Sequence, residues 1–218
     1  FARGVDEYAG LVEAGCTGMT IYQETYDREL YAKLHRWGAK RDYLDRLEAP
    51  ARGLEAGMRS VGIGALLGLA DPAVEALRLY QHADDLRRRY WRGGITVSFP
   101  RLRPESGGFE PPCPVTDRTL AQLIFAFRIA LPDVPLVLST RESPAFRDGI
   151  AGLGISRMSV ASRTTVGGYA SADARRATGQ FAVADERDVP TFCRALRSRG
   201  LDPVFKNWDK AFRDGHGV

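Results

Sequence analysis

Charged and hydroxyl side chains follow several short apolar runs of this chain, each close to the point where the run ends. Glu24 ends the first run, Arg101 lies at the end of the third, and Arg141 follows the fourth. Ser159 and Arg163 flank the end of the fifth run. A carboxylate accepts hydrogen bonds from an ammonium group, and a guanidinium donates two parallel hydrogen bonds to a carboxylate or a phosphate. The pattern therefore indicates a site for a small charged molecule, built from the ends of several runs.

The apolar runs alternate with stretches of helical periodicity, which predicts strands and helices in turn. The expected strands cover residues 18–24, 60–69, 95–102, 135–140 and 158–162. The expected helices cover residues 6–14, 49–56, 72–91, 117–131, 145–151 and 189–199. The strands are apolar throughout, a pattern typical of parallel strands covered by helices.

Five parallel strands fit a doubly wound open sheet or part of a (β/α)8 barrel. No GxGxxG fingerprint follows the first strand, and Gly62-Ile-Gly64 falls inside a strand, where it indicates close backbone approach. Barrel enzymes assemble their active sites at the carboxyl ends of the strands, so the polar residues at the strand ends favour the barrel. The predicted fold class is α/β: the C-terminal part of a (β/α)8 barrel over residues 1–170, with a helical extension over 171–218.

Arginine dominates the positive charge of the chain. Of the 31 Lys and Arg residues only four are lysines, Lys33, Lys40, Lys206 and Lys210, in a chain of net charge +4. This bias is compatible with carboxylate or phosphate partners, although a composition bias with solvated faces is the preferred explanation. With 44% hydrophobic residues and no apolar run near the ~18 residues that a membrane helix needs, membrane and disordered classes are excluded. We expect neither a membrane nor a nucleic-acid partner.

The histidines and cysteines form no recognised motif. They are His35, His82, His216, Cys16, Cys113 and Cys193. Neither a Ser-His-Asp arrangement nor a metal or disulfide spacing can be assembled from them, which counts against a hydrolase and predicts no metal ligands in this chain. His82 is expected to be a packed or surface residue. Scattered cysteines and the lack of a secretory pattern near the start predict a reducing, cytoplasmic location.

Eight blocks of the chain resemble, in order, the C-terminal two thirds of the 2-iminoacetate synthase family, the tyrosine lyases of bacterial thiamine biosynthesis. The blocks are Tyr22-Gln-Glu-Thr-Tyr26, Gly62-Ile-Gly-Ala-Leu-Leu-Gly-Leu69, Tyr90-Trp91, Ser98-Phe-Pro-Arg-Leu-Arg-Pro104, Leu138-Ser-Thr-Arg-Glu-Ser143, Phe146-Arg-Asp148, Gly167-Gly-Tyr169 and Asp202-Pro-Val-Phe-Lys-Asn-Trp-Asp209. The resemblance implies a radical S-adenosyl-L-methionine (SAM) barrel that cleaves the Cα–Cβ bond of L-tyrosine to 2-iminoacetate and p-cresol. It also implies that residues 171–218 form the region associated with biotin and thiamin synthesis.

The same resemblance implies cofactors and partners. The family binds SAM and a 4Fe-4S cluster, and its cluster ligands form a CxxxCxxC motif that is absent from this chain, so we expect the chain alone to be inactive. Thiazole synthase is the implied protein partner, and flavodoxin or ferredoxin the implied electron donor. The tyrosine lyase of hydrogenase maturation shares the block 22–26 but carries a further C-terminal cysteine motif. Because only Cys193 follows Cys113, the thiamine branch is favoured.

The resemblance assigns roles to the candidate site residues. Glu24 is expected to accept from the amino group of SAM and Arg46 to pair with its carboxylate, while Gly62 and Gly64 leave room for the cofactor. Arg163 and Ser159 are the expected ligands of the tyrosine carboxylate, with Arg141 and Arg101 as second choices. The alternatives are that Glu24 and Arg46 only pair with each other, that the glycines serve packing, and that the arginines form salt bridges that close the barrel.

Two functions of other classes stay open at this point. One is a cluster-free lyase or aldolase on the same barrel that uses arginine and glutamate side chains. The other is a binding module or an inactive paralogue.

Overall fold

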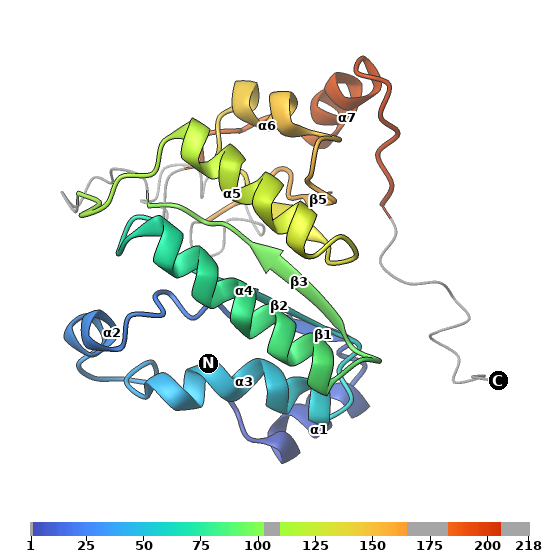
Figure 1. Cartoon of the computed structure of the whole chain (residues 1–218). Coiled ribbons are helices and arrows are strands. Elements are labelled where there is room, and N and C mark those ends of the chain that lie inside the picture. Colours follow the sequence, from blue (N-terminus) through green and yellow to red (C-terminus); the bar gives the residue numbers. More distant parts are fainter. Residues whose placement is uncertain (1, 103–109, 165–182, 206–218) are drawn as a thin grey trace.

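A single parallel sheet organises the chain (Figure 1). The computed structural model describes residues 2–102, 110–164 and 183–205. Its strands are β1 (Gly18–Thr20), β2 (Ser60–Gly64), β3 (Gly94–Ser98), β4 (Leu136–Leu138) and β5 (Arg157–Met158), and they lie in the order β1-β2-β3-β4-β5. A doubly wound sheet reverses its strand order part-way, whereas consecutive parallel neighbours are the arrangement of a barrel wall.

The helices are α1 (Val5–Glu13), α2 (Arg28–Leu34), α3 (Tyr43–Glu55), α4 (Pro72–Arg89), α5 (Asp117–Ala130), α6 (Pro144–Ile150) and α7 (Val189–Arg197). Figure 1 shows α3, α4 and α5 side by side along one face of the sheet. Apolar residues of β2, β3 and β4 and of α4 and α5 form one core, which includes Val61, Val97, Leu79, Leu120 and Leu136. Burial of these side chains fixes the strands against the helical layer and so fixes where each strand ends.

The parallel pairing continues beyond the regular strands toward the predicted site. The amide of Gln23 donates to the carbonyl of Gly64, and the amide of Leu66 donates to the carbonyl of Glu24. Bridges join Glu24 to Ala65 and Leu67 to Arg101. The strand-end residues therefore belong to the sheet itself and not to free loops.

The prediction of the second helical region is wrong in its boundaries. Helix α2 is not expected from the sequence pattern, and α3 begins at Tyr43, six residues earlier than the predicted start at residue 49. Aspartate side chains cap both helices, since Asp27 accepts from the Leu30 amide and Asp42 from the Asp45 amide. Helix α3 also continues through Pro50, a residue that normally ends a helix.

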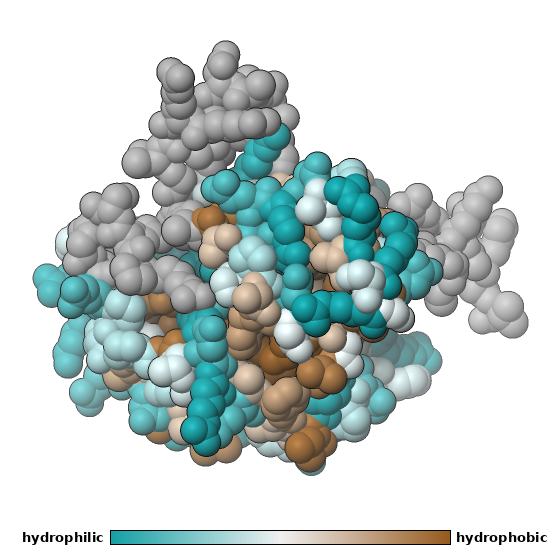
Figure 2. All heavy atoms as spheres, turned by 90° about the horizontal axis from the view of Figure 1, so that it is seen from above, coloured by the Kyte–Doolittle hydropathy of each residue, from teal (hydrophilic) through white to brown (hydrophobic). Residues whose placement is uncertain are grey.

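Strands β1 and β5 are the edges of the described sheet, and each borders a cavity. One of about 560 Å³ lies beside β1, and one of about 650 Å³ lies beside β5, α7 and residues 201–205. Figure 2 shows a strip of apolar side chains among hydrophilic ones on the face seen from above. Among the described residues, no helix is both long and apolar enough to cross a membrane.

Candidate functional site

A cluster of three charged side chains lies at the carboxyl end of β1. Oε1 of Glu24 accepts from Nζ of Lys40 at 2.7 Å and from Nη2 of Arg46 at 3.0 Å. Glu24 has a φ of 73°, in the left-handed region that a non-glycine residue enters at a cost of about 1–3 kcal/mol. A strained conformation at this position indicates that the direction of the carboxylate is held by its surroundings.

Arg46 reaches this cluster from α3, the second helix after β1 along the chain. Its Nε donates to the carbonyl of Tyr22 at 2.6 Å, and only 8% of its side chain is exposed. Lys40 is more open, with 43% of its side chain exposed. One carboxylate thus faces two cations, which leaves a net positive charge. The predicted proximity of Glu24 and Arg46 exists in the structure, and Lys40 is a third member that the sequence pattern does not single out.

The cluster borders the cavity beside β1. Tyr22, Glu24, Lys40 and Arg46 line this cavity of about 560 Å³ together with apolar residues that include Met19. A ligand with an α-amino and a carboxylate group requires a carboxylate for the first and a cation for the second. The side-chain hydrogen bonds of Glu24 to the described residues use Oε1, so Oε2 is the atom placed to accept from an ammonium group. The donor set therefore fits the methionyl end of SAM.

The residues present do not fit an iron–sulfur cluster. Cys16, Cys113 and Cys193 are unpaired cysteines from separate parts of the chain, and Cys193 is buried in α7. Within the described ranges, no three His, Cys, Asp or Glu side chains are grouped as metal ligands. The ligands of such a cluster must come from outside this set, and we derive no step through a cluster from these residues.

Gly62 and Gly64 allow close contact between neighbouring strands. A Cβ at Gly62 would lie 2.5 Å from Oγ1 of Thr20, and a Cβ at Gly64 would lie 2.7 Å from the carbonyl oxygen of Ser98 and 2.9 Å from the Tyr22 ring. The space next to both glycines is thus filled by Thr20 and Tyr22. Close packing of the neighbouring strands therefore explains why both positions are glycine. The cofactor role of Gly62 and Gly64 stays a prediction.

Arg101 is the centre of a buried ion-pair network at the end of β3. Its Nε donates to both carboxylate oxygens of Glu142 at 3.0 Å, its Nη1 donates to the Val115 carbonyl at 2.7 Å, and its Nη2 contacts Glu142 and Asp117. Arg101 is 2% exposed and Glu142 is 1% exposed. This arrangement closes the sheet end, so Arg101 has little capacity left for a substrate.

Ser159 lies at the end of β5 and is held by backbone contacts. Its Oγ accepts from the Thr140 amide at 3.1 Å, and its carbonyl accepts from Nη2 of Arg147. Arg147 is buried and paired with Asp185, while its guanidinium lies 4.6 Å from the centre of the Phe192 ring. Sequence reasoning missed Arg147 and Asp185.

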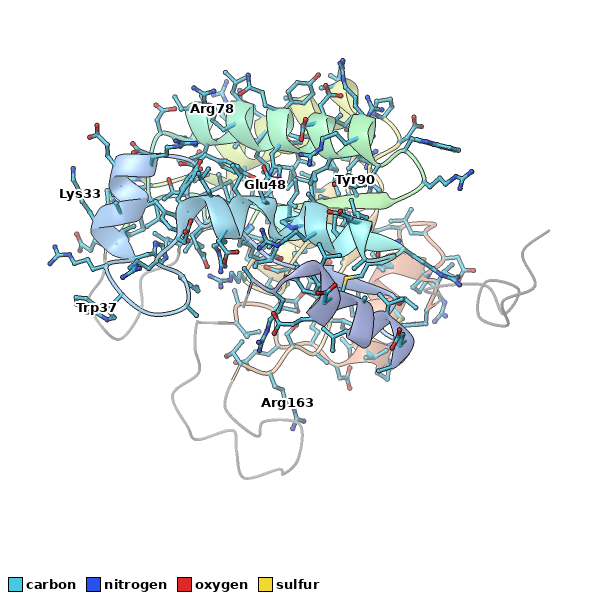
Figure 3. The ribbon with its side chains drawn as sticks, turned by 90° about the horizontal axis from the view of Figure 1, so that it is seen from below. Lys33, Trp37, Glu48, Arg78, Tyr90 and Arg163 are labelled. Carbon is cyan, nitrogen blue, oxygen red and sulfur yellow. The ribbon has the colours of Figure 1, made fainter. Side chains whose placement is uncertain are left out.

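Arg141 and Arg163 are the two remaining predicted arginines. Arg141 is half-buried and its amide donates to Oγ of Ser139 at 3.3 Å. Arg163 is exposed, and Figure 3 shows its side chain on the opposite side of the molecule from Glu48 and Arg78 of the outer helical layer. The sheet order places β4 next to β5, so Arg141 and Ser159 follow adjacent strands, whereas Glu24 follows β1 at the other edge. The substrate roles of these residues stay predictions.

The sequence of this chain is similar to those of two bacterial 2-iminoacetate synthases. The chain is 44% identical to the 2-iminoacetate synthase of Escherichia coli (strain K12) over 204 residues, and 43% identical to that of Salmonella typhimurium (strain LT2) over 205 residues. The chain is a homologue of the 2-iminoacetate synthases. This homologue aligns over 93–94% of its own length but spans only 54% of each relative. Residues 98–202 also match the family model of the Biotin and Thiamin Synthesis associated domain.

Solved structures confirm the predicted fold class of this 2-iminoacetate synthase homologue. The crystal structure of HydG, a maturase of the FeFe-hydrogenase, superposes with a TM-score of 0.87 at 35% identity and covers 98% of this chain and 46% of HydG. HydG from Carboxydothermus hydrogenoformans gives 0.84 at 34% identity, over 98% of this chain and 48% of that protein. The five strands are therefore part of a radical SAM (β/α)8 barrel. The boundary predicted at residues 170 and 171 lies outside the described residues and stays a prediction.

Proposed function

We propose that this chain forms part of the barrel of a radical SAM tyrosine lyase, which cleaves the Cα–Cβ bond of L-tyrosine to 2-iminoacetate and p-cresol for thiazole and thiamine synthesis. The observation that carries the proposal is the cluster of Glu24, Lys40 and Arg46 beside the cavity at β1. The 44% identity to the 2-iminoacetate synthase of Escherichia coli over 93% of the chain supports the reaction class.

Within this function, the cluster at β1 binds the methionyl end of SAM. Oε2 of Glu24 accepts from the ammonium group, and Arg46 and Lys40 face the carboxylate. When it is bound and reductively cleaved, SAM supplies the 5'-deoxyadenosyl radical that abstracts a hydrogen atom from the substrate. The 4Fe-4S cluster takes its ligands from a CxxxCxxC segment that this sequence does not contain.

The substrate end of the site is built from the ends of β4 and β5. Ser159 and Arg163 bind the α-carboxylate of tyrosine, and Arg141 assists them. Hydrogen abstraction is selective only when the reacting atom is held within about 1 Å of its productive position, which makes a fixed carboxylate necessary. Arg101 keeps the end of β3 in place through Glu142 and is the weakest candidate for direct contact.

The proposed partners and location follow from the same function. Thiazole synthase receives the 2-iminoacetate, and an electron donor such as flavodoxin or ferredoxin supplies the reducing electron. The enzyme acts in the cytoplasm, without a nucleic-acid or membrane partner.

The test uses the complete polypeptide that contains this chain, with its cluster reconstituted without oxygen. With SAM, L-tyrosine and a reductant, we expect p-cresol to appear by liquid chromatography. Arg163→Ala raises the KM for tyrosine about tenfold or more, as the loss of a charged hydrogen bond requires. Arg88→Ala, which removes an arginine with a 76% exposed side chain on α4, leaves the KM unchanged. A protein that binds neither SAM nor tyrosine in calorimetry, and forms no p-cresol, overturns the proposal.

A second candidate is a tyrosine lyase of the hydrogenase-maturation type, which the superposition with HydG favours. Both candidates release p-cresol from tyrosine. The encoding gene distinguishes them, because only the hydrogenase-maturation type carries a further cysteine motif downstream of the barrel.

A further inference from the structure

A buried carboxylate on α4 binds the turn that follows β1. Glu75 is 1% exposed, and its two oxygens accept from the Tyr26 amide at 3.1 and 3.0 Å. Oε1 also accepts from the hydroxyl of Thr25, and that hydroxyl accepts in turn from the Asp27 amide at 3.1 Å. Glu75 therefore holds three consecutive residues of the turn at once.

The Glu75 carboxylate is held by hydrogen bonds from uncharged groups. Among the residues that the structure describes, Glu75 forms no ion pair, although it lies in the first turn of α4, where the helix dipole favours a negative charge. Burial raises the pKa of its carboxyl group, because the charged form is favoured by water. Burial of a carboxylate is offset only by the groups that it binds, so the hydrogen bonds of Glu75 to the turn are what stabilise it here.

The turn that Glu75 binds is the one that orients the side chain of Glu24. Only Thr25 separates Glu24 from Tyr26, and Glu24 is the non-glycine residue with a φ of 73°. The backbone carbonyl of Glu24 accepts from the Leu66 amide, just beyond the neighbouring strand β2, at 2.7 Å. On α4, Glu75 binds Thr25 and Tyr26, the two residues that follow Glu24. The backbone of Glu24 is thus held from both directions while its side chain faces Lys40 and Arg46.

We propose that Glu75 is a positioning residue, which orients the Glu24 carboxylate toward the α-amino group of the bound cofactor without touching the cofactor itself. The inference rests on the proposed function, since it assumes that Glu24 accepts from that amino group. It predicts that Glu75 and the amino group are energetically coupled, although they belong to different parts of the site.

The experiment measures binding in the complete, reconstituted polypeptide by calorimetry, with two ligands: SAM and an analogue that lacks the α-amino group. The wild type is expected to bind SAM about 10- to 100-fold more tightly than the analogue, the range of one charged hydrogen bond. Glu75→Gln should weaken SAM about tenfold and change the affinity for the analogue less than threefold. The control Glu48→Gln removes a half-exposed carboxylate of α3, in the outer helical layer of Figure 3, and should change neither affinity.

The affinities of two variants distinguish a failure of the Glu24 contact from a failure of the role of Glu75. If Glu24→Gln discriminates between the ligands as the wild type does, the proposed contact with the amino group fails. If Glu24→Gln loses the discrimination but Glu75→Gln weakens both ligands equally, Glu75 has only a structural role and the present inference is overturned.

A second measurement covers the case in which Glu75→Gln binds poorly because it folds poorly. Thr25→Val removes one donor to Glu75 and keeps the branched shape of the side chain. It should weaken SAM selectively, by a smaller factor than Glu75→Gln. In hydrogen exchange without SAM, the amides of residues 26 and 27 should exchange at least about tenfold faster in Thr25→Val, while those of 79–86 in α4 keep their protection. Equal protection of the turn in Thr25→Val and the wild type would contradict the inference.

Discussion

The pH dependence of stability should depend strongly on His82, which lies on α4 and packs against α3 and the turn after β1. Its Nδ1 lies 2.8 Å from the hydroxyl of Tyr26, and its ring is also hydrogen-bonded to the backbone of Leu47. Burial lowers the pKa of His82 to about 4, against 6.5 in the unfolded chain, with Asp85 and Arg89 acting in opposite directions nearby. The folded protein therefore holds this imidazole neutral at pH 5–6, where the unfolded chain protonates it.

The sign and the size follow from the two pKa values. Between pH 6.5 and about 4 the unfolded state binds the extra proton, so stability is complete above pH 6.5 and is lost as the pH falls toward 4. Each pH unit in this window corresponds to about 1.4 kcal/mol. Without solvent contact these two pKa values correspond to a loss of about 2.5 kcal/mol between pH 7.5 and 4.5, and because the ring keeps some contact with solvent we expect about 2 kcal/mol. Glu75 acts in the opposite direction, since its pKa is raised on folding.

The assay compares the wild type with His82→Gln, which cannot titrate but can still accept from Tyr26. Urea unfolding at pH 7.5 and 4.5 should show that the wild type loses about 2 kcal/mol more than the variant, with the contribution of Glu75 common to both. Carbon-13 signals of the histidine rings provide a direct check. The signal that is missing in His82→Gln belongs to His82, and its chemical shift should stay at the value of a neutral ring down to about pH 5. A midpoint near 6.5 for that signal, or equal pH slopes for the two proteins, would refute the reasoning.

Three further predictions concern stability. Gly64→Ala should lower the free energy of unfolding in urea by about 1–3 kcal/mol, because the added Cβ would lie 2.7 Å from a backbone oxygen. The control Gly149→Ala on α6, with open space around the added Cβ, should be neutral or raise the free energy of unfolding by up to about 1 kcal/mol. Asp185→Asn should cost about 3 kcal/mol in the same assay, since it leaves buried Arg147 without its charged partner; a change below 1 kcal/mol would contradict this. The isolated 218-residue chain should form concentration-dependent oligomers in light scattering, because both edge strands border open cavities; a monomer with a sharp cooperative melt would exclude this.

The strands could be predicted because their signal is local. Apolar runs between turn residues identify all five strands, and the carboxyl-end rule places Glu24 and Arg101 at the carboxyl ends of their strands, as the bridges at these residues show. The start of α3 could not be predicted in this way, because Pro50 suggests a helix start and only the side chain of Asp42 shows where the first turn begins. Local patterns therefore determine the elements better than their ends.

The residues that hold the candidate site are harder to predict, because their partners are distant in the sequence. Glu75 lies 49 positions from Tyr26, and Arg147 lies 38 positions from Asp185. One signal was present: Glu75 lies four residues before Leu79 on the apolar face of α4, where a carboxylate is unusual. A charged residue at an apolar position indicates a buried partner, but the sequence alone does not say which.

The arginines at the strand ends show why position alone does not assign a role. Arg101 and Arg163 both lie beyond the carboxyl ends of parallel strands, β3 and β5, yet Arg101 is enclosed by Glu142, Asp117 and a backbone carbonyl, whereas Arg163 is exposed. A guanidinium whose donors are already bound by buried carboxylates gains little from a substrate carboxylate, since binding would exchange one ion pair for another. What decides the role of Arg101 is therefore the pair of carboxylates that other elements supply, and its position at a strand end does not by itself make it a substrate ligand.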